Sequence, residues 1–279
     1  MLHLHFLRGL RRSLASTTAL SACLLALSCH GQSSTQTQAA SAHIDSTTLP
    51  GDTLELIFAG DIMTHGPQIR VAAQADGSYD FSQSFSLVRP TIERADLAIG
   101  NLETTFGGKP YSGYPMFSSP EALAVALHEA GFDVLTTSNN HSCDRRGYGI
   151  THTIDVLDSL GIATTGSYRN LSERPSRTPL IQSVRGIKLA ILAYTYGTNG
   201  LPVPHPTVVD TISKELIAAD LRRADSLGAE YKIVQIHWGN EYEKSPNRAQ
   251  RELAQWLADQ GVDAVIGSHP HVVQESTRL

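Results

Sequence analysis

Short apolar segments alternate with longer amphipathic ones along residues 54–266 of the chain. A run of about four to eight apolar residues, rich in strand-forming types and bounded by turn residues, is typical of a buried strand. By this criterion we predict strands at residues 54–59, 96–100, 132–137, 181–184, 187–194, 232–237 and 262–266.

Helix start and stop signals lie between most of these strands. Ser119 can cap a helix whose first position is Pro120 and which ends at Gly131. We predict further helices at residues 149–160, 211–227 and 247–260. The alternation of strands and helices predicts an α/β fold. The turn Arg185-Gly186 joins two adjacent predicted strands into a hairpin, so we expect a mixed sheet.

The composition is that of a globular protein. The chain has 279 residues, of which 41% are hydrophobic and 18% charged, and this excludes a collagen-like, disordered or multi-span membrane protein. The net charge of -5 gives no electrostatic reason to expect nucleic-acid binding. Three cysteines are too few for a disulfide framework.

The N-terminal segment has the layout of a secretory signal. Residues 1–12 carry Arg8, Arg11 and Arg12 and no acid, and an apolar stretch over residues 14–27 follows. This stretch is short for a membrane-spanning helix. It ends at Ala26-Leu27-Ser28-Cys29, which resembles a bacterial lipobox. We therefore predict a lipoprotein-type signal at residues 1–29 with Cys29 as the lipidated residue.

Two alternatives to lipidation at Cys29 stay open. Cys23 fits the lipobox pattern better but leaves too short an apolar segment, and a signal that is cleaved without lipidation is the other alternative. Residues 30–52 are rich in Ser, Thr, Gln and Ala and have no apolar periodicity, which predicts a flexible linker. We assign residues 53–279 to one folded domain that stands outside the cytoplasmic membrane.

Polar residues follow several of the predicted strands directly. In an alternating α/β sheet the carboxyl ends of neighbouring strands point to one edge, so these side chains can converge although they are far apart in the sequence. Carboxylate, amide and imidazole ligands in this number suit one or two divalent transition ions, with Mn, Fe and Zn not distinguished. The candidates for metal binding are Asp61, Glu103, Asn140, His237, His269 and His271.

The order of these clusters resembles the five-motif series of the calcineurin-like metallophosphoesterases, and the details resemble the CapA family of poly-gamma-glutamate capsule synthesis proteins. The resemblance covers residues 54–274, nearly the whole predicted domain. The motifs that carry it are Phe58-Ala59-Gly60-Asp61-Ile62-Met63, Gly100-Asn101-Leu102-Glu103, Asn139-Asn140-His141 with Asp144, Gly149 and Thr153, His237-Trp238-Gly239 with Glu241-Tyr242, and Gly267-Ser268-His269-Pro270-His271 with Gln274.

The resemblance implies a layered α/β/β/α sandwich at the cell envelope. It implies a role in making, exporting or anchoring an anionic capsule polymer such as polyglutamate, together with a membrane-bound synthase or export complex. Carried over by position, Glu103 is a candidate ligand or base and His141 the general acid of a metal-dependent hydrolase. The candidates for substrate binding are Asn139, Arg145, Trp238, Glu241 and Tyr242.

Several of these candidates have a structural alternative. Trp238 and Tyr242 can simply pack beside a strand end, and Arg145 with Arg146 can belong to a solvated loop face. Cys143 lies two residues after His141, but nothing in the sequence shows a base that activates it, so we favour a structural thiol over a nucleophile.

The sequence also departs from the metallophosphoesterase pattern. Met63 stands where an Asp-x-His motif has its histidine, and the bridging aspartate of the second motif is replaced around Asn101 and Glu103. Relatives continue with further strands where this chain ends at Leu279, so we expect the last part of the fold to be missing. Three hypotheses remain: a CapA-like envelope protein with a metal site, a genuine metallohydrolase, and a non-catalytic scaffold with a relic site.

Overall fold

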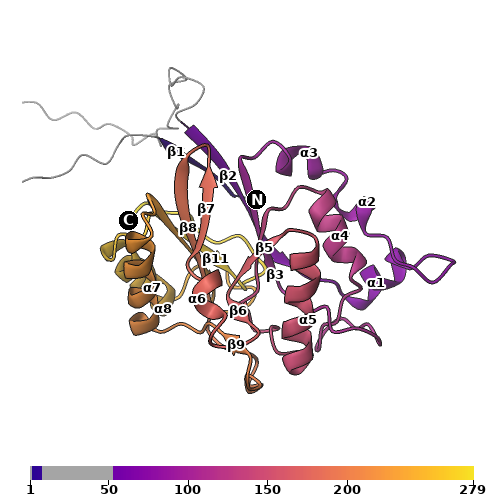
Figure 1. The fold of residues 1–279 in the computed structure, drawn as a ribbon. Coiled ribbons are helices and arrows are strands. Elements are labelled where there is room, and N and C mark those ends of the chain that lie inside the picture. Colours follow the sequence, from indigo (N-terminus) through magenta and orange to yellow (C-terminus); the bar gives the residue numbers. More distant parts are fainter. Residues whose placement is uncertain (1, 8–52) are drawn as a thin grey trace, which may run out of the picture.

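Two sheets pack face to face, with helices on both outer sides (Figure 1). The structure is a computed structural model that describes residues 2–7 and 53–279. The predicted α/β/β/α layering is confirmed, because one group of helices covers the first sheet and another covers the second.

The first sheet is parallel over four of its five strands, and only β1 runs antiparallel to its neighbour β2. β1 lies within the predicted signal segment. Cys29 and the predicted linker lie outside the described residues. The strands in spatial order are β1 (Leu2–Leu7), β2 (Thr53–Ile62), β3 (Leu97–Leu102), β4 (Val134–Thr136) and β5 (Ala163–Thr165).

The second sheet is mixed, as predicted. Three of its strands are parallel, and β7 and β8 form the antiparallel hairpin expected at the Arg185-Gly186 turn. A separate two-stranded ribbon joins β6 (Ser167–Tyr168) to β9 (Val208–Val209). The strands of the second sheet in spatial order are β11 (Ala264–Ser268), β10 (Tyr231–His237), β8 (Ile187–Thr195) and β7 (Leu180–Val184).

The four predicted helices are present within a few residues of their expected bounds: α4 (Ala122–Glu129), α5 (Arg146–Ser159), α7 (Lys214–Ser226) and α8 (Arg248–Asp259). Reciprocal hydrogen bonds between Asn247 and Gln250 cap the start of α8. Four short helices were not predicted, because helices of four to seven residues are too short for an apolar periodicity to be detected. These are α1 (Gly66–Ala72), α2 (Ser82–Phe85), α3 (Arg89–Ile92) and α6 (Arg174–Arg177).

The central core fills the space between the two sheets. Alternate residues of β2, among them Leu54 and Leu56, meet Leu189 and Ile191 of β8, and all four side chains are fully buried. The other faces of the sheets bury the apolar sides of α4 and α5 and of α7 and α8, respectively. Because close-packed layers on both faces hold the strands, the carboxyl ends of β2, β3, β8 and β10 are fixed relative to one another.

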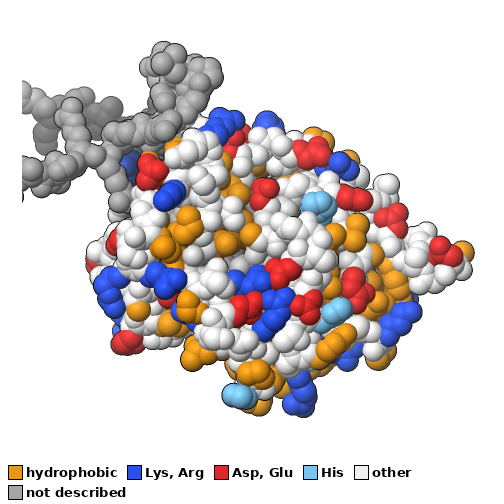
Figure 2. Space-filling model, in the orientation of Figure 1, with side chains coloured by type: hydrophobic (Ala, Val, Ile, Leu, Met, Phe, Trp, Pro, Cys, Tyr) orange, Lys and Arg blue, Asp and Glu red, His pale blue; other side chains and the backbone are white. Residues whose placement is uncertain are grey.

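A buried ion-pair network ties α6 to the rest of the domain. Arg174 bonds both Asp210 and Asp220, at 2.7 Å from Nε to Oδ1 of the first and 2.5 Å from Nη2 to Oδ2 of the second. Figure 2 shows basic and acidic side chains intermixed on the surface between α6 and α5. Further ion pairs of this region join Arg169 to Asp155, Asp158 and Glu173, and Arg177 to Asp158 and Glu173.

Among residues 2–7 and 53–279, the structure contains no helix of the length and apolar character needed to cross a membrane.

Candidate functional site

Polar residues from the carboxyl ends of both sheets meet at one place. Asp61 lies at the end of β2, Glu103 directly follows β3, and His237 ends β10. The segment after β11 contributes His269 and His271, and both adopt a left-handed backbone, with φ of 96° and 55°. These residues are far apart in the sequence, and the parallel strand arrangement brings them together as predicted.

Asp61 is held by four neighbouring groups. Its Oδ2 is 2.9 Å from Nδ1 of His271 and accepts a hydrogen bond from the backbone nitrogen of His269 at 3.0 Å. Its Oδ1 accepts a hydrogen bond of 2.8 Å from Asn101 and lies 3.7 Å from Nδ1 of His237. Burial alone raises the pKa of Asp61, but these hydrogen bonds outweigh it and hold the pKa well below its usual range. Asp61 is therefore a carboxylate at neutral pH.

Glu103 is the most unusual residue of the cluster. Its side chain is fully buried, and neither carboxyl oxygen has a hydrogen-bond partner within the described part of the chain. Burial, reinforced by the negative charge of Asp61, raises the pKa of Glu103 to about 9. A buried carboxyl group without donors is costly, so its retention here indicates that a further group completes the site.

His237 and His269 are both held in the neutral form. The Nε2 atom of His237 lies 2.8 Å from Oδ1 of Asn140, and its Nδ1 lies 3.0 Å from Oγ of Ser268. Burial lowers the pKa of His237 to about 3, and burial together with the proximity of His237 lowers that of His269 to about 4. Nδ1 of His269 has no hydrogen-bond partner among the described residues. Neutral imidazole is the form that binds metal ions.

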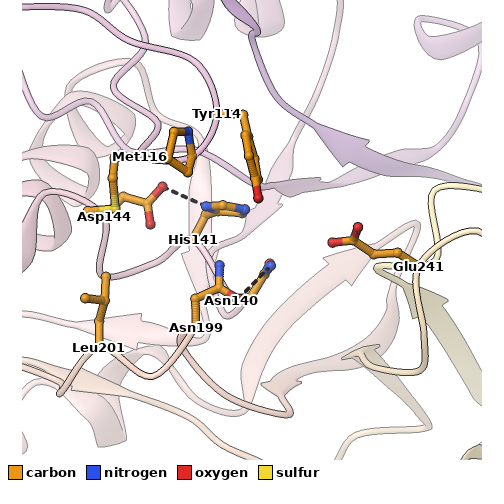
Figure 3. Close-up of a pocket in the computed structure, with 9 residues that line it drawn as sticks. Tyr114, Met116, Asn140, His141, Asp144, Asn199, Leu201 and Glu241 are labelled. Atoms are coloured by element: carbon orange, nitrogen blue, oxygen red, sulfur yellow. Dashed lines mark hydrogen bonds and ion pairs between the residues drawn. The ribbon is translucent and has the colours of Figure 1, made fainter.

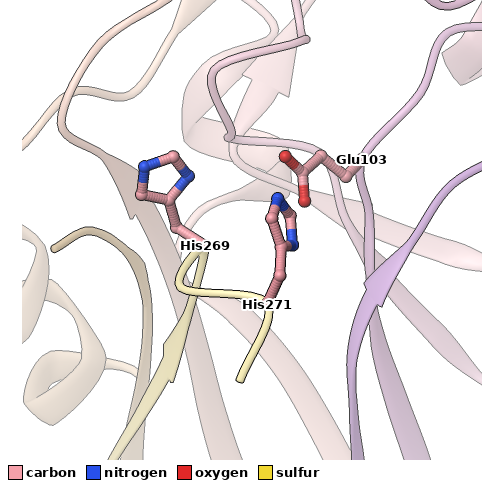
Figure 4. A group of neighbouring side chains, drawn as sticks. All are labelled: Glu103, His269 and His271. Carbon is pink, nitrogen blue, oxygen red and sulfur yellow. The ribbon is translucent and has the colours of Figure 1, made fainter. Parts of the chain in front are cut away.

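Two overlapping groups of side chains have the geometry of a metal site. Glu103, His269 and His271 form one group, and Asp61, Glu103 and His237 form the other, each with its candidate ligand atoms within 4.8 Å of one another. Figure 4 shows Glu103 facing the ring of His271, with His269 on the other side. The donor set and the unpartnered atoms of Glu103 and His269 fit a divalent ion bound by oxygen and nitrogen.

The structure shows where the residues that depart from the metallophosphoesterase pattern lie, namely Met63, Asn101 and Glu103. Met63 lies half-buried in the loop after β2. Asn101 bonds Asp61 through its amide nitrogen, which also lies 3.2 Å from Nδ1 of His237, so it orients two candidate ligands. Glu103 belongs to both groups and thus occupies the shared position between them.

His141 is positioned by a buried carboxylate. Its Nδ1 is 2.7 Å from Oδ2 of Asp144, and the same oxygen accepts a hydrogen bond of 2.6 Å from the backbone nitrogen of Phe117. The ring of Phe117 stands perpendicular to the imidazole at a centroid distance of 4.6 Å. These contacts fix the ring of His141 and leave its Nε2 on the side away from Asp144. Such a pair is suited to proton transfer.

A cavity of about 280 Å³ adjoins Asn140 and His141 (Figure 3). Part of its lining was not predicted, because the segments 107–118 and 196–204 carry no recognisable motif and only the tertiary fold brings them here. The lining residues are Tyr114, Pro115, Met116, Asn140, His141, Asp144, Asn199, Leu201 and Glu241.

Two of the five substrate-binding candidates lie at the open side of the site. Glu241 is exposed and lines the cavity. Tyr242 is 70% exposed, and its ring lies 6.0 Å from that of His271. Both are accessible to a substrate.

The other three candidates have structural contacts. Asn139 is buried, donates to the carbonyl oxygen of Leu102 at 2.7 Å and accepts from the backbone nitrogen of His141 at 3.1 Å, so it holds the loop that carries His141. Trp238 packs in the core under α7 and α8, because successive residues along a strand point to opposite faces. Arg145 donates to the carbonyl oxygens of Gly108 and Pro110. The placement of Trp238 matches its structural alternative, whereas Arg145 is half-buried against the backbone and does not belong to a solvated loop face.

Cys143 is buried beside Ile150 and Ile154. Burial, together with the charge of Asp144, raises the pKa of its thiol to about 11. A thiol in this environment stays protonated and is a poor nucleophile, which supports the structural interpretation.

The fold and the site define an α/β sandwich protein with a carboxylate and histidine cluster at the carboxyl ends of its strands. A sequence model of the family described as bacterial capsule synthesis protein PGA_cap matches residues 55–278, so the chain belongs to that family. The predicted resemblance to CapA proteins is confirmed.

Named relatives agree with this assignment. The chain is 28% identical over 79% of its length to a capsule biosynthesis protein CapA of Bacillus anthracis, and 28% identical over 81% to a PGA biosynthesis protein CapA of Bacillus subtilis. It covers 55% and 60% of these relatives, respectively. A solved NAD nucleotidase of Haemophilus influenzae matches with a TM-score of 0.42 and 15% identity, covering 68% of this chain and 32% of that one.

Proposed function

We propose that this chain acts at the bacterial cell envelope in the synthesis or export of a capsule polymer, poly-gamma-glutamate or a similar anionic polymer, and that it does so with a divalent metal centre. Family membership supports the capsule role, since the relatives are named for capsule and PGA biosynthesis. The chain covers 55% and 60% of the length of those two relatives. The activity of the longer proteins is therefore proposed for this chain.

The burial of Glu103, and the lack of hydrogen-bond partners for its carboxyl group among the described residues, is the observation that best supports a metal centre. Its two unpartnered carboxyl oxygens lie in a fully buried position among two groups of candidate ligands. A cation supplies the missing partner and stabilises the ionised carboxylate. Glu103 with His269 and His271 would hold an ion on one side, and Asp61 with His237 on the other, with Asn140 beside His237. Mn, Fe and Zn all suit these ligands.

Metal content tests this part of the proposal directly. The full chain should contain about one or two equivalents of Mn, Fe or Zn per molecule, measured by mass spectrometry after removal of free metal. Glu103→Gln keeps the shape of the side chain but removes its charge, so it should lower the metal content strongly. Glu252→Gln, a change on the exposed face of α8, is the matched control and should not. Well-folded natural protein that holds no metal would support the scaffold hypothesis instead.

A cellular experiment tests the capsule role. Deletion of this chain should lower the amount of cell-surface polymer in the organism that makes it, and the natural sequence should restore that amount. If polymer production depends on the metal centre, Glu103→Gln should restore little of it although the protein is present at the normal level. Unchanged polymer after deletion would contradict the capsule role, whatever the metal content.

The pair formed by His141 and Asp144 favours a second candidate function, a metal-dependent hydrolase of phosphoesters or amide bonds. A bound divalent ion would lower the pKa of a water molecule and polarise the scissile group. His141, fixed by Asp144 beside the candidate ligands, would give a proton to the leaving group. Turnover of a chromogenic phosphodiester or of a glutamyl amide, lost on removal of metal, would support this candidate.

We also propose how the chain is attached at the cell envelope. The signal at residues 1–29, lipidation at Cys29 and the linker at 30–52 would tether the domain of residues 53–279 to the outer face of a membrane. There it would contact the polymer together with a membrane-bound synthase or export complex. Copurification of such a complex from detergent extracts of the natural organism tests this partner.

A further inference from the structure

The cavity beside His141 has an unpartnered acceptor at its inner end. Asp144 is 3% exposed and uses Oδ2 for both His141 and the backbone of Phe117. Its Oδ1 has no hydrogen-bond partner in the part of the chain that the structure describes, although Asp144 lines the cavity. A buried carboxylate oxygen that lacks a donor indicates that the ligand of this cavity supplies one.

The described part of the cavity lining contains acidic side chains without a basic lysine or arginine to balance them. Glu241 lies at the side opposite Asp144 (Figure 3), so two carboxylates face the same space. The described residues of the lining include neither lysine nor arginine. Arg145, the nearest arginine in the sequence, is directed to the carbonyl oxygens of Gly108 and Pro110. Two carboxylates without a lysine or arginine beside them favour a cation over an anion in this cavity.

The remaining walls are apolar or aromatic. Tyr114, Met116 and Leu201 line the cavity together with Asp144 (Figure 3). A short chain of methylene groups can lie against these side chains, and the face of a tyrosine ring also attracts a cation. The volume of about 280 Å³ is near the lower end of the range for small-ligand pockets.

We propose that this cavity is a binding subsite for an aliphatic ammonium group, of the kind that a lysine side chain or a short diamine carries. The ammonium donates to Oδ1 of Asp144, the methylene groups contact Met116 and Leu201, and Glu241 adds attraction from the open side. Two carboxylates alone would not define a site. The unpartnered Oδ1 of Asp144 fixes where the ammonium group binds, and the apolar walls select a ligand with methylene groups. The subsite does not depend on the proposed metal centre.

Binding to the full chain can be measured by calorimetry in the presence of a chelator, so that metal coordination does not contribute. The probe is Nα-acetyl-lysine methylamide, and its uncharged counterpart is Nα-acetyl-norleucine methylamide. A hydrogen bond from a charged donor to a buried carboxylate should give the lysine probe an affinity about tenfold higher or more. Inorganic phosphate should neither bind to this cavity nor compete.

Two variants and one control locate the binding. Asp144→Asn should remove most of the preference for the lysine probe. Glu241→Gln, at an exposed position, should weaken binding of the lysine probe about two- to fivefold. Glu243→Gln lies two residues away outside the cavity lining and should have no effect.

Three results would overturn the inference: equal affinity for the lysine and norleucine probes, competition by phosphate, or identical binding to the Glu241→Gln and Glu243→Gln proteins. If Asp144→Asn does not fold, the comparison of the two glutamate variants still decides. If the natural protein binds no metal, the metal centre is disproved, but the ammonium subsite is unaffected.

Discussion

The carboxyl group of Glu103 and the imidazole of His237 approach each other to 3.5 Å, from Oε1 to Nε2, in the centre of the site. Burial, with the charge of Asp61, raises the pKa of the first to about 9, and burial lowers the pKa of the second to about 3. Both groups are therefore neutral near pH 7 in the metal-free protein, and the contact is not an ion pair.

This relationship predicts how the stability of the metal-free protein depends on pH. In the unfolded chain Glu103 ionises near 4.5, so between pH 4.5 and about 9 the folded protein binds one more proton there, and its stability falls as pH rises. The neutral histidines contribute the opposite slope, but only below 6.5. Above pH 6.5 the raised pKa of His271 adds to the fall, since its pairing with Asp61 is lost on deprotonation.

Urea unfolding in the presence of a chelator, at several pH values between 6.5 and 8.5, checks this prediction. The free energy of unfolding of the natural protein should fall across this range. In Glu103→Gln the fall should be smaller, by at most about 1.4 kcal/mol per pH unit, which is the value for a single proton. Parallel pH profiles for the two proteins would show that Glu103 ionises normally in the folded state.

The contact between His141 and Asp144 predicts the behaviour of a hydrolase. If the chain turns over a substrate, His141→Ala should lower kcat by about 10²- to 10⁴-fold, because the general acid is lost. Asp144→Asn should lower kcat with a smaller change in KM, since it disturbs the orientation and tautomer of His141. Metal content should stay unchanged in both variants.

Cys143→Ala provides the control for these variants. The thiol is buried and its pKa is raised to about 11, so its removal should leave turnover intact. If instead Cys143→Ala abolished turnover and His141→Ala did not, the assignment of His141 as general acid would be wrong.

Much of the fold and of the carboxylate and histidine cluster was predictable because the relevant signals are local. A polar residue that directly follows an apolar strand, such as Asp61 or His237, is visible in the sequence, and parallel strands align such residues at one edge. Trp238 was named as a substrate-binding candidate, although it comes one residue after His237 and strand periodicity therefore directs it to the helices.

The cavity could not be predicted in the same way. Tyr114 and Met116 lie in a segment whose shape depends on two backbone hydrogen bonds between Ser112 and Ser118 and on the packing of Gly113 against the backbone of His65. Such contacts depend on tertiary structure and leave no periodic pattern. The pairing of His141 with Asp144 was easier to foresee from the sequence, because a spacing of three residues within one motif allows the contact.

The signal segment gives a prediction that concerns residues outside the described part of the chain. Metabolic labelling with a fatty acid in a bacterial host should label the natural protein and Cys23→Ser, but not Cys29→Ser, because only the cysteine that becomes the mature N-terminus is acylated. Labelling lost in Cys23→Ser would move the site to Cys23. An unlabelled protein with a new N-terminus by mass spectrometry would indicate a cleaved signal without lipid.

The network around Arg174 predicts a large effect on stability far from the site. The Arg174 side chain is 12% exposed and bonds Asp210 and Asp220, whose side chains are 2% and 5% exposed. Arg174→Met keeps the apolar length but leaves two buried carboxylates without their cation, so urea unfolding should show a loss of about 3–5 kcal/mol. Arg248→Met breaks an exposed pair with Glu252 and should change stability by less than about 0.5 kcal/mol. Equal effects of the two substitutions would mean that the buried network contributes no more than a surface ion pair.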